Sequence, residues 1–214
     1  MILGIYGSGG AGRGAKEIAE LQGTWDEIVF IDDTVPEDVF KGLKRLSFDT
    51  FKNTYPRSSA KVVIAMGEPE YKIQLYNRVK DAGYEFANVI HPSVYVSPDA
   101  HLGAGIIAQM GAMIAVDAYV GNNVTLEQYA VVAHDTVIED HAQISAFVML
   151  AGHSKVGRGT YIGIGVPVRE EVTIGSNTIV GMGSVVQKDI PDNVIAMGNP
   201  ARVMKNRDGE KVFR

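Results

Sequence analysis

Residues 120–138 read VGNNVTLEQYAVVAHDTVI, and an aliphatic residue stands at every sixth position of this stretch. The spacing continues without a slip from residue 96 to residue 186. The sixteen positions are Val96, Leu102, Ala108, Ile114, Val120, Leu126, Val132, Ile138, Ile144, Leu150, Val156, Ile162, Val168, Ile174, Val180 and Val186. A period of six fits neither the 3.6 residues per turn of a helix nor the alternation of one long strand. It is typical of a hexapeptide β-helix, a coil of short strands.

Each six-residue unit is expected to form one flat side of the coil, with its aliphatic residue pointing inward. The residue four positions later is small in most units, and we expect it to turn the corner. Three sides complete one coil, so residue i should lie beneath residue i+18, at the strand spacing of roughly 4.8 Å. The sequence therefore predicts a second domain, residues 92–214, that consists of a parallel β-helix followed by a C-terminal tail.

Composition excludes several classes of function. The 214-residue chain has a net charge of −5 and no cysteine. Without a basic run, nucleic acid is not expected as a partner, and without cysteine there is no disulfide framework or thiolate site. No apolar run approaches about 18 residues and no secretory signal is recognisable. A cytoplasmic protein that does not contact membranes is therefore expected.

Residues 1–91 lack the six-residue period and alternate between strand-like and helix-like segments. We predict strands at residues 2–6, 28–31, 62–66 and 86–90, and helices ending near residue 21, at residues 48–54 and at residues 71–82. The remainder of residues 34–60 reads as loop, and residues 91–95 read as a linker. This alternation predicts a small Rossmann-like α/β domain with a parallel sheet.

The glycines of residues 7–12, GSGGAG, satisfy the pattern G-x-G-x-x-G between a strand and a helix, and Asp32 follows 20 residues after the last of them. The pattern indicates a dinucleotide site. However, only one mononucleotide-binding half is present before the coil begins. The same backbone N–H groups suit the diphosphate of a nucleotide-sugar. A tight turn without a ligand is the third interpretation.

Two histidines are placed together by the eighteen-residue register. Gly152 should lie above His134, and His153 above Asp135. An isolated surface histidine is usually only solvated. An imidazole beside a carboxylate is more basic and is suited to act as a general base. His134 is therefore the candidate catalytic residue, with Asp135 as its partner.

Three features together resemble a known family. They are the six-residue array, the segment GNPAR at residues 198–202, and the segment YGSGGAGR at residues 6–13. The chain resembles the two-domain hexapeptide-repeat sugar acyltransferases of bacteria, of the type that N-acetylates UDP-4-amino-sugars or O-acetylates sialic acid. The resemblance implies a left-handed β-helix, a homotrimer with active sites between neighbouring coils, acetyl-CoA as co-substrate and no metal.

The resemblance also implies roles for particular residues. It assigns the catalytic roles to His134 and Asp135. It assigns acetyl-CoA binding to Gly152, Ile164, Gly181 and Met182. It assigns nucleotide-sugar binding to Ala11, Gly12, Arg13, Asp32, Asp33 and Gly67.

The function expected from these features is acetyl-CoA-dependent N-acetylation of a nucleotide-linked amino-sugar, most simply a UDP-4-amino-sugar. Sugar O-acetylation and a non-catalytic nucleotide-sugar-binding trimer are the alternatives. A γ-type carbonic anhydrase, with zinc held by histidines, and a serine acetyltransferase are rival enzymes with this kind of coil. Two positions depart from the family pattern, with Glu127 in place of an asparagine and Gln143 in place of a histidine.

Overall fold

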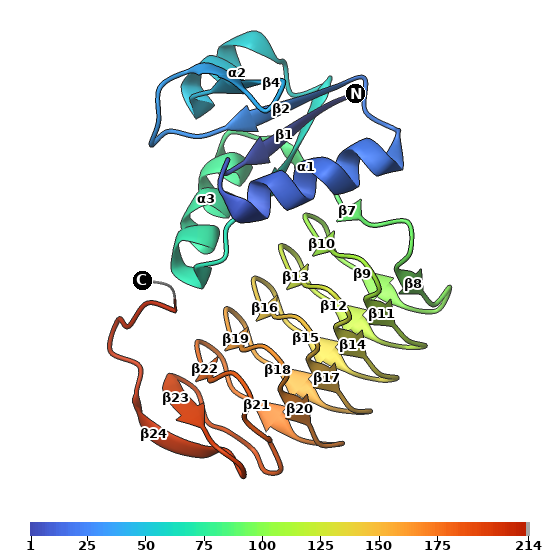
Figure 1. The fold of residues 1–214 in the computed structure, drawn as a ribbon, viewed down its shortest axis with the longest axis vertical. Helices are drawn as coiled ribbons and strands as arrows, with labels where there is room; N and C mark the ends of the chain where they lie inside the picture. Colours follow the sequence, from blue (N-terminus) through green and yellow to red (C-terminus); the bar gives the residue numbers. More distant parts are fainter. Residues whose placement is uncertain (213–214) are drawn as a thin grey trace.

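The computed structural model describes residues 1–212, which form an α/β domain seated on one end of a left-handed parallel β-helix (Figure 1). Helix α3 runs beside the junction, and the C-terminal segment returns along the coil toward the same helix (Figure 1). No helix in residues 1–212 is long and apolar enough to cross a bilayer. The fold class predicted from the sequence is confirmed.

The α/β domain contains a six-stranded sheet in the order β3-β4-β2-β1-β5-β6. All its neighbouring pairs are parallel except β3 and β4. Its strands are β1 (Ile2–Tyr6), β2 (Glu27–Ile31), β3 (Asp38–Phe40), β4 (Leu43–Leu46), β5 (Ala60–Ile64) and β6 (Glu85–Phe86). Its helices are α1 (Gly10–Gln22), α2 (Phe48–Thr54) and α3 (Pro69–Asp81).

Strands β3 and β4 form a hairpin within residues 34–60, which we predicted to be mostly loop. That interpretation is wrong because β4 pairs in parallel with β2, aligning Phe30 with Arg45. The Arg45 guanidinium also donates two hydrogen bonds to the Asp38 carboxylate, at 2.8 and 2.7 Å. The hairpin is polar and lies at the sheet edge, so it lacks the alternation of apolar residues that would predict strands.

The β-helix has three sheets, one on each side of the coil, and their strands are parallel except for β24, which is antiparallel to β23. One contains β8 (Tyr95–Val96), β11 (Met113–Ile114), β14 (Val131–Val132), β17 (Met149–Leu150) and β20 (Pro167–Val168). A second contains β9 (His101–Leu102), β12 (Tyr119–Val120), β15 (Val137–Ile138), β18 (Lys155–Val156) and β21 (Thr173–Ile174). The third contains β7 (Val89–Ile90), β10 (Ile107–Ala108), β13 (Thr125–Leu126), β16 (Gln143–Ile144), β19 (Tyr161–Ile162), β22 (Ile179–Val180), β23 (Val194–Met197) and β24 (Arg202–Asn206).

The register within each sheet is the predicted step of eighteen residues. Val131 pairs with Met149, for example, and Met149 pairs with Pro167. Fourteen of the sixteen aliphatic positions are at most 2 % exposed, and Val96 and Leu102 at the first coil are partly buried. The lumen of the coil is therefore one continuous apolar core.

The corners of the coil are made by two residues that lie two and three positions after each aliphatic residue. The second of them has left-handed backbone in every unit from Gly105 to Gly183. The small residues expected to turn the corner lie instead just past the turn and inside it; Ala130 and Thr136 are fully buried. The predicted position of the turn is therefore wrong. The small residue is visible in the sequence, but the left-handed backbone of the residue before it is not.

The two parts meet where a single strand was expected over residues 86–90. The structure splits this segment into β6, which belongs to the α/β sheet, and β7, which pairs with β10 of the coil. Between them, the Asn88 side chain donates to Gly103 O and accepts from Ile106 N, both at 2.9 Å. The division that we propose, residues 1–91 and 92–214, falls one residue after β7 and leaves this coil strand with the α/β domain.

Candidate active site

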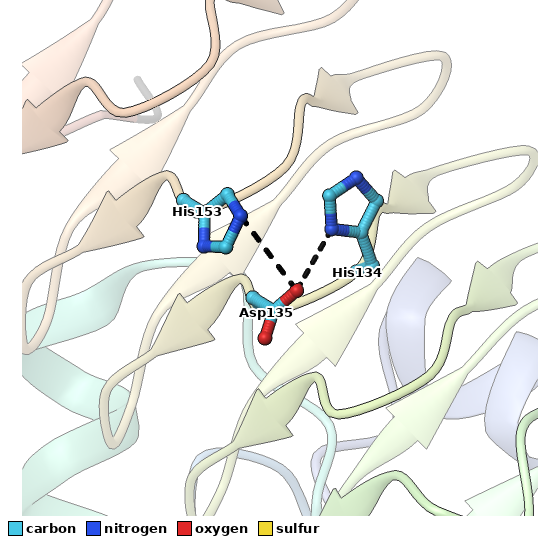
Figure 2. Close-up of side chains that lie close together, drawn as sticks. All are labelled: His134, Asp135 and His153. Carbon is cyan, nitrogen blue, oxygen red and sulfur yellow. Dashed lines mark hydrogen bonds and ion pairs between the residues drawn. The ribbon is translucent and has the colours of Figure 1, made fainter.

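His134 and Asp135 form the corner between β14 and β15 (Figure 2). His134 Nδ1 lies 2.8 Å from Asp135 Oδ2. An ionised carboxylate only accepts hydrogen bonds, so Nδ1–H is the donor, and in the neutral imidazole Nε2 is the nitrogen with the lone pair. The pair has the arrangement of a general base with its orienting acid.

Backbone hydrogen bonds fix the positions of His134 and Asp135. Asp135 has a φ of 57°, in the left-handed region that aspartate tolerates better than most residues. Its N–H donates to Val116 O at 3.2 Å, and His134 O accepts from His153 N at 3.1 Å. The corner is thereby tied to the coil before it and to the coil after it.

The residues one coil further on complete the cluster. His153 Nε2 lies 3.8 Å from Asp135 Oδ2, and the two imidazole rings are nearly perpendicular with centroids 5.2 Å apart (Figure 2). A Cβ atom added to Gly152 would lie 2.5 Å from His134 Cε1 and 2.6 Å from His134 Nε2. Glycine is required there because the His134 ring lies over its backbone.

These three side chains also form the one cluster in residues 1–212 whose donor atoms could hold a metal ion. The donor atoms of His134, Asp135 and His153 lie within 4.8 Å of one another, and all three residues are exposed. The set of two imidazoles and a carboxylate matches ligands used for zinc. A metal assay on purified protein is the direct check on the carbonic anhydrase alternative.

An apolar face adjoins this corner. The His134, Asp135 and His153 side chains are 54 %, 43 % and 56 % exposed, so the cluster is open on its outer side. The outward residues of the sheet that ends at this corner lie in one register column: Tyr95, Met113, Val131, Met149 and Pro167. Tyr95 and Met149 are more than half exposed, and Met113 is 39 % exposed.

The α/β domain contains a cavity of about 700 Å³ at the carboxyl ends of β1, β2 and β5, with α3 as its further wall. Of the residues predicted to bind a nucleotide-sugar, Ala11, Asp32, Asp33 and Gly67 line it, together with Gly7, Gly9 and Gly10. Gly12 and Arg13 are not among its lining residues. Gly12 is needed for packing, because a Cβ atom there would lie 1.9 Å from Gly7 O.

Asp32 braces the glycine-rich turn. It accepts hydrogen bonds from the backbone and hydroxyl of Ser8 at 3.1 and 2.5 Å, and from those of Thr34 at 3.0 and 2.6 Å. Burial opposes its ionisation, but these four hydrogen bonds prevail and lower the pKa of Asp32. The carboxylate is therefore charged and held rigidly at the cavity wall.

Asp33 belongs to a cluster that sequence reasoning missed in part. It accepts from Phe48 N at 2.9 Å, from the Arg78 guanidinium at 2.6 Å and from the Tyr6 hydroxyl. Burial, reinforced by the hydrogen bond to Asp33, raises the pKa of Tyr6. Tyr6 could have been found, since it ends the strand before the glycine-rich turn. Arg78 lies on α3 and carries no local signal.

The residues predicted to bind acetyl-CoA lie at two different corners of the coil. Gly152 stacks on His134, whereas Ile164 and Met182 stack at the corner between the third sheet and the apolar face. Ile164 is 47 % exposed and Met182 is 73 % exposed. One chain therefore does not bring all of the predicted acetyl-CoA residues together.

A coil of six-residue sides with an imidazole–carboxylate pair at a corner, joined to an α/β domain with a glycine-lined cavity, defines a hexapeptide-repeat transferase. Residues 3–79 match the family model of the PglD N-terminal domain, and residues 117–152 match that of the bacterial transferase hexapeptide (six repeats).

Three solved structures resemble the chain over nearly its whole length. The acetyltransferase domain of PglB from Neisseria gonorrhoeae FA1090 is 29 % identical, with 95 % of this chain and 99 % of that chain covered and a TM-score of 0.91. PerB from Caulobacter crescentus, solved with CoA and GDP-perosamine, is 30 % identical (95 % and 97 % covered, TM-score 0.88). WeeI from Acinetobacter baumannii AYE is 27 % identical (95 % and 100 % covered, TM-score 0.89). The chain belongs to the two-domain hexapeptide-repeat sugar acetyltransferases and is an acyltransferase.

Proposed function

We propose that this protein transfers the acetyl group of acetyl-CoA to the amine of a nucleotide-linked amino-sugar. The observation that carries the proposal is the His134–Asp135 pair, with the free imidazole nitrogen lying over Gly152. The cavity of the α/β domain supplies a second site with the chemistry of a nucleotide diphosphate, since its wall includes the start of α1. The complex of PerB with CoA and GDP-perosamine supports both substrates.

In the proposed mechanism, His134 Nε2 takes a proton from the acceptor amine as the nitrogen attacks the thioester carbonyl. Asp135 stabilises the resulting imidazolium through its bond to Nδ1. A backbone N–H, for which Gly152 is the candidate, meets the oxyanion of the tetrahedral intermediate. The C–S bond then breaks and the imidazolium proton passes to the departing thiolate. Holding both substrates together removes the need for a covalent intermediate.

We also propose that the active unit is a homotrimer with its sites between coils. The predicted acetyl-CoA residues occupy two corners of one coil, so a site that uses both requires a second copy. The exposed apolar column next to His134 is the surface on which such a copy would pack. Within such a site, Gly181 and Met182 of one chain would face His134 of its neighbour.

For the nucleotide, we propose UDP as the first candidate, as the sequence resemblance implies. GDP is the second candidate, because the relative PerB was solved with a GDP-sugar. The test is release of CoA thiol from acetyl-CoA in the presence of UDP- and GDP-linked 4-amino-sugars. Formation of an amide on one of these sugars is the expected result. Thiol release only with hydroxyl acceptors would indicate an O-acetyltransferase, and binding without thiol release would indicate a non-catalytic trimer.

A further inference from the structure

A second cavity, of about 520 Å³, lies at the junction of the α/β domain and the coil. The coil contributes Gln109, Glu127 and Gln128 to its wall. Four residues line both this junction cavity and the nucleotide cavity: Gly10, Ala11, Met66 and Gly67. The two cavities are therefore neighbours around the start of α1, where a diphosphate would bind.

Glu127 is a partly buried carboxylate in the wall of the junction cavity. Its Oε1 accepts from Gln143 Nε2 at 2.9 Å, and its Oε2 accepts from Ala146 N at 3.1 Å. Both donors are neutral amides, and within residues 1–212 Glu127 forms no ion pair at 4.0 Å or less. Nearby Lys72 directs its ammonium group to Thr125 Oγ1 at 2.8 Å instead. Lys72 therefore acts on this carboxylate only through space, and no cationic group in the described part of the chain contacts it directly.

We propose that Glu127 is a specificity-determining residue that binds the ammonium group of the acceptor amino-sugar and thereby selects an amine over a hydroxyl. This inference rests on the proposed function, because it requires a nucleotide-sugar whose diphosphate lies at the start of α1. From there the sugar extends into the junction cavity and reaches Glu127.

The chemistry of the carboxylate favours an amine. Each oxygen of Glu127 has accepted one hydrogen bond and keeps a second lone pair. An ammonium group adds a charge-assisted hydrogen bond and a directly bound positive charge. Because the attacking nitrogen must be the neutral amine, the bound ammonium first gives up one proton to water, and His134 then takes the second as the thioester is attacked. A hydroxyl group can only donate a neutral hydrogen bond, so it leaves a partly buried carboxylate uncompensated.

The position along the coil is consistent with this role. Glu127 directly precedes the corner residue Gln128, and the eighteen-residue register places Ile164 and Met182 on the same corner. Because these are the residues predicted to bind acetyl-CoA, the acceptor amine and the acyl donor share one edge of the coil. His134 of a neighbouring copy would then approach from outside.

Glu139 provides a matched control that tests whether the role of Glu127 is only structural. Glu139 occupies the same place in its six-residue unit, one position after the aliphatic residue, and its Oε2 accepts from Arg158 N at 3.0 Å. Glu139 also pairs with Lys155 at 2.9 Å, and it lies at a different corner from Glu127. Glu139→Gln therefore reports what is lost when a bridging carboxylate is neutralised away from the cavity.

The experiment measures Kd by calorimetry for matched acceptors at pH 7. GDP-perosamine is compared with GDP-rhamnose, which carries a hydroxyl group in place of the 4-amine, and a UDP-linked 4-amino-sugar is compared with its 4-hydroxy counterpart. In wild type we expect the amine to bind about 10- to 100-fold more tightly, the range for a charge-assisted hydrogen bond. Glu127→Gln should reduce this preference to about threefold or less, and Glu139→Gln should leave it unchanged.

A preference that persists in Glu127→Gln, or that is lost equally in Glu139→Gln, overturns the proposal. Equal binding of amine and hydroxyl sugars by wild type also overturns it, while thiol release with amino-sugars leaves the proposed function standing. If wild type binds none of these sugars and releases no thiol, the proposed function fails as well. The two failures are thereby distinguishable.

Discussion

The orientation of the candidate base depends on a single backbone conformation. Asp135 adopts left-handed φ at its corner, which directs its carboxylate to His134 Nδ1. Aspartate and asparagine adopt this conformation more readily than most other side chains. The residue is thus suited both to the turn and to the chemistry, and a β-branched residue at this position would disturb both.

The first prediction concerns His134. We expect His134→Ala to lower kcat by about two to four orders of magnitude, the range for loss of a general base. His153→Ala is the control, because it leaves the bond from His134 Nδ1 to Asp135 in place. Single-turnover acetyl transfer measures both. Near-normal turnover in His134→Ala would show that the proton leaves by another route.

The second prediction concerns Gly152. In Gly152→Ala the new methyl group would lie about 2.5 Å from the His134 ring, so the ring must turn away from the next coil. We expect kcat to fall at least about tenfold while the melting temperature changes by only a few degrees, because the ring is exposed and free to move. Unchanged kcat would mean that the ring does not need this position to react.

The cluster around His134 could be predicted because residues that are eighteen positions apart in the sequence lie directly above one another in the coil. A step of eighteen residues placed Gly152 and His153 over His134 and Asp135, and the structure shows this arrangement. The glycine motif has no repeat that fixes the position of each residue. It therefore could not distinguish the residues that line the cavity from Gly12, which packs against the backbone of Gly7. Arg78 reaches the cavity through tertiary packing, for which the sequence carries no signal.

At the scale of elements, α3 connects the two domains. Its outer residues Tyr71, Gln74 and Arg78 line the nucleotide cavity, while Lys72 on the same helix is fully buried against the coil. Tyr76 stacks on Phe86 with ring centroids 4.0 Å apart. The cavity proposed for the nucleotide and the contact between the domains therefore involve different faces of one helix.

The third prediction follows from Lys72. Burial lowers its pKa to about 7, whereas an unfolded lysine titrates near 10.4. Between these values the unfolded chain binds a proton that the folded chain does not. The free energy of unfolding should therefore rise with pH from about 7 to about 10, by up to about 1.4 kcal/mol per pH unit.

Lys72→Met should flatten this slope, whereas Lys52→Met, on the surface of α2, should keep it. Urea unfolding at pH 7, 8 and 9 measures the free energies. A slope in Lys72→Met equal to that of wild type would show that the buried amine remains charged.

Regular elements were predictable in proportion to their periodicity. The coil was exact in register because sixteen units repeat one pattern. Strand β1 and helix α2 were predicted with their observed bounds. The β3–β4 hairpin was missed because its pairing with β2 and the Arg45–Asp38 bonds are tertiary features. The division of residues 86–90 into two strands follows from the neighbouring sheets, not from the segment itself.

At the scale of the whole molecule, the fourth prediction tests assembly. Met113→Glu and Met149→Glu place charges on the apolar column beside His134, so we expect the double variant to lose the proposed trimer and most acetyl transfer. The control is the double variant Leu21→Glu and Val39→Glu, which adds the same two charges at residues that are 61 % and 73 % exposed on the α/β domain. Light scattering gives the mass and circular dichroism the fold. A variant that stays trimeric would place the interface on another face.

The uniform stacking of the corners has a consequence for acceptor size. Each coil advances by one strand spacing, roughly 4.8 Å, and returns the chain to the same three directions. Inserting one whole coil ahead of β14 would raise the imidazole by that step without changing the way it faces, whereas inserting a single six-residue unit would turn it to another edge. The number of coils between the α/β domain and His134 thus sets the distance from the proposed nucleotide site to the proposed base, and we expect this distance to limit the length of the acceptor sugar.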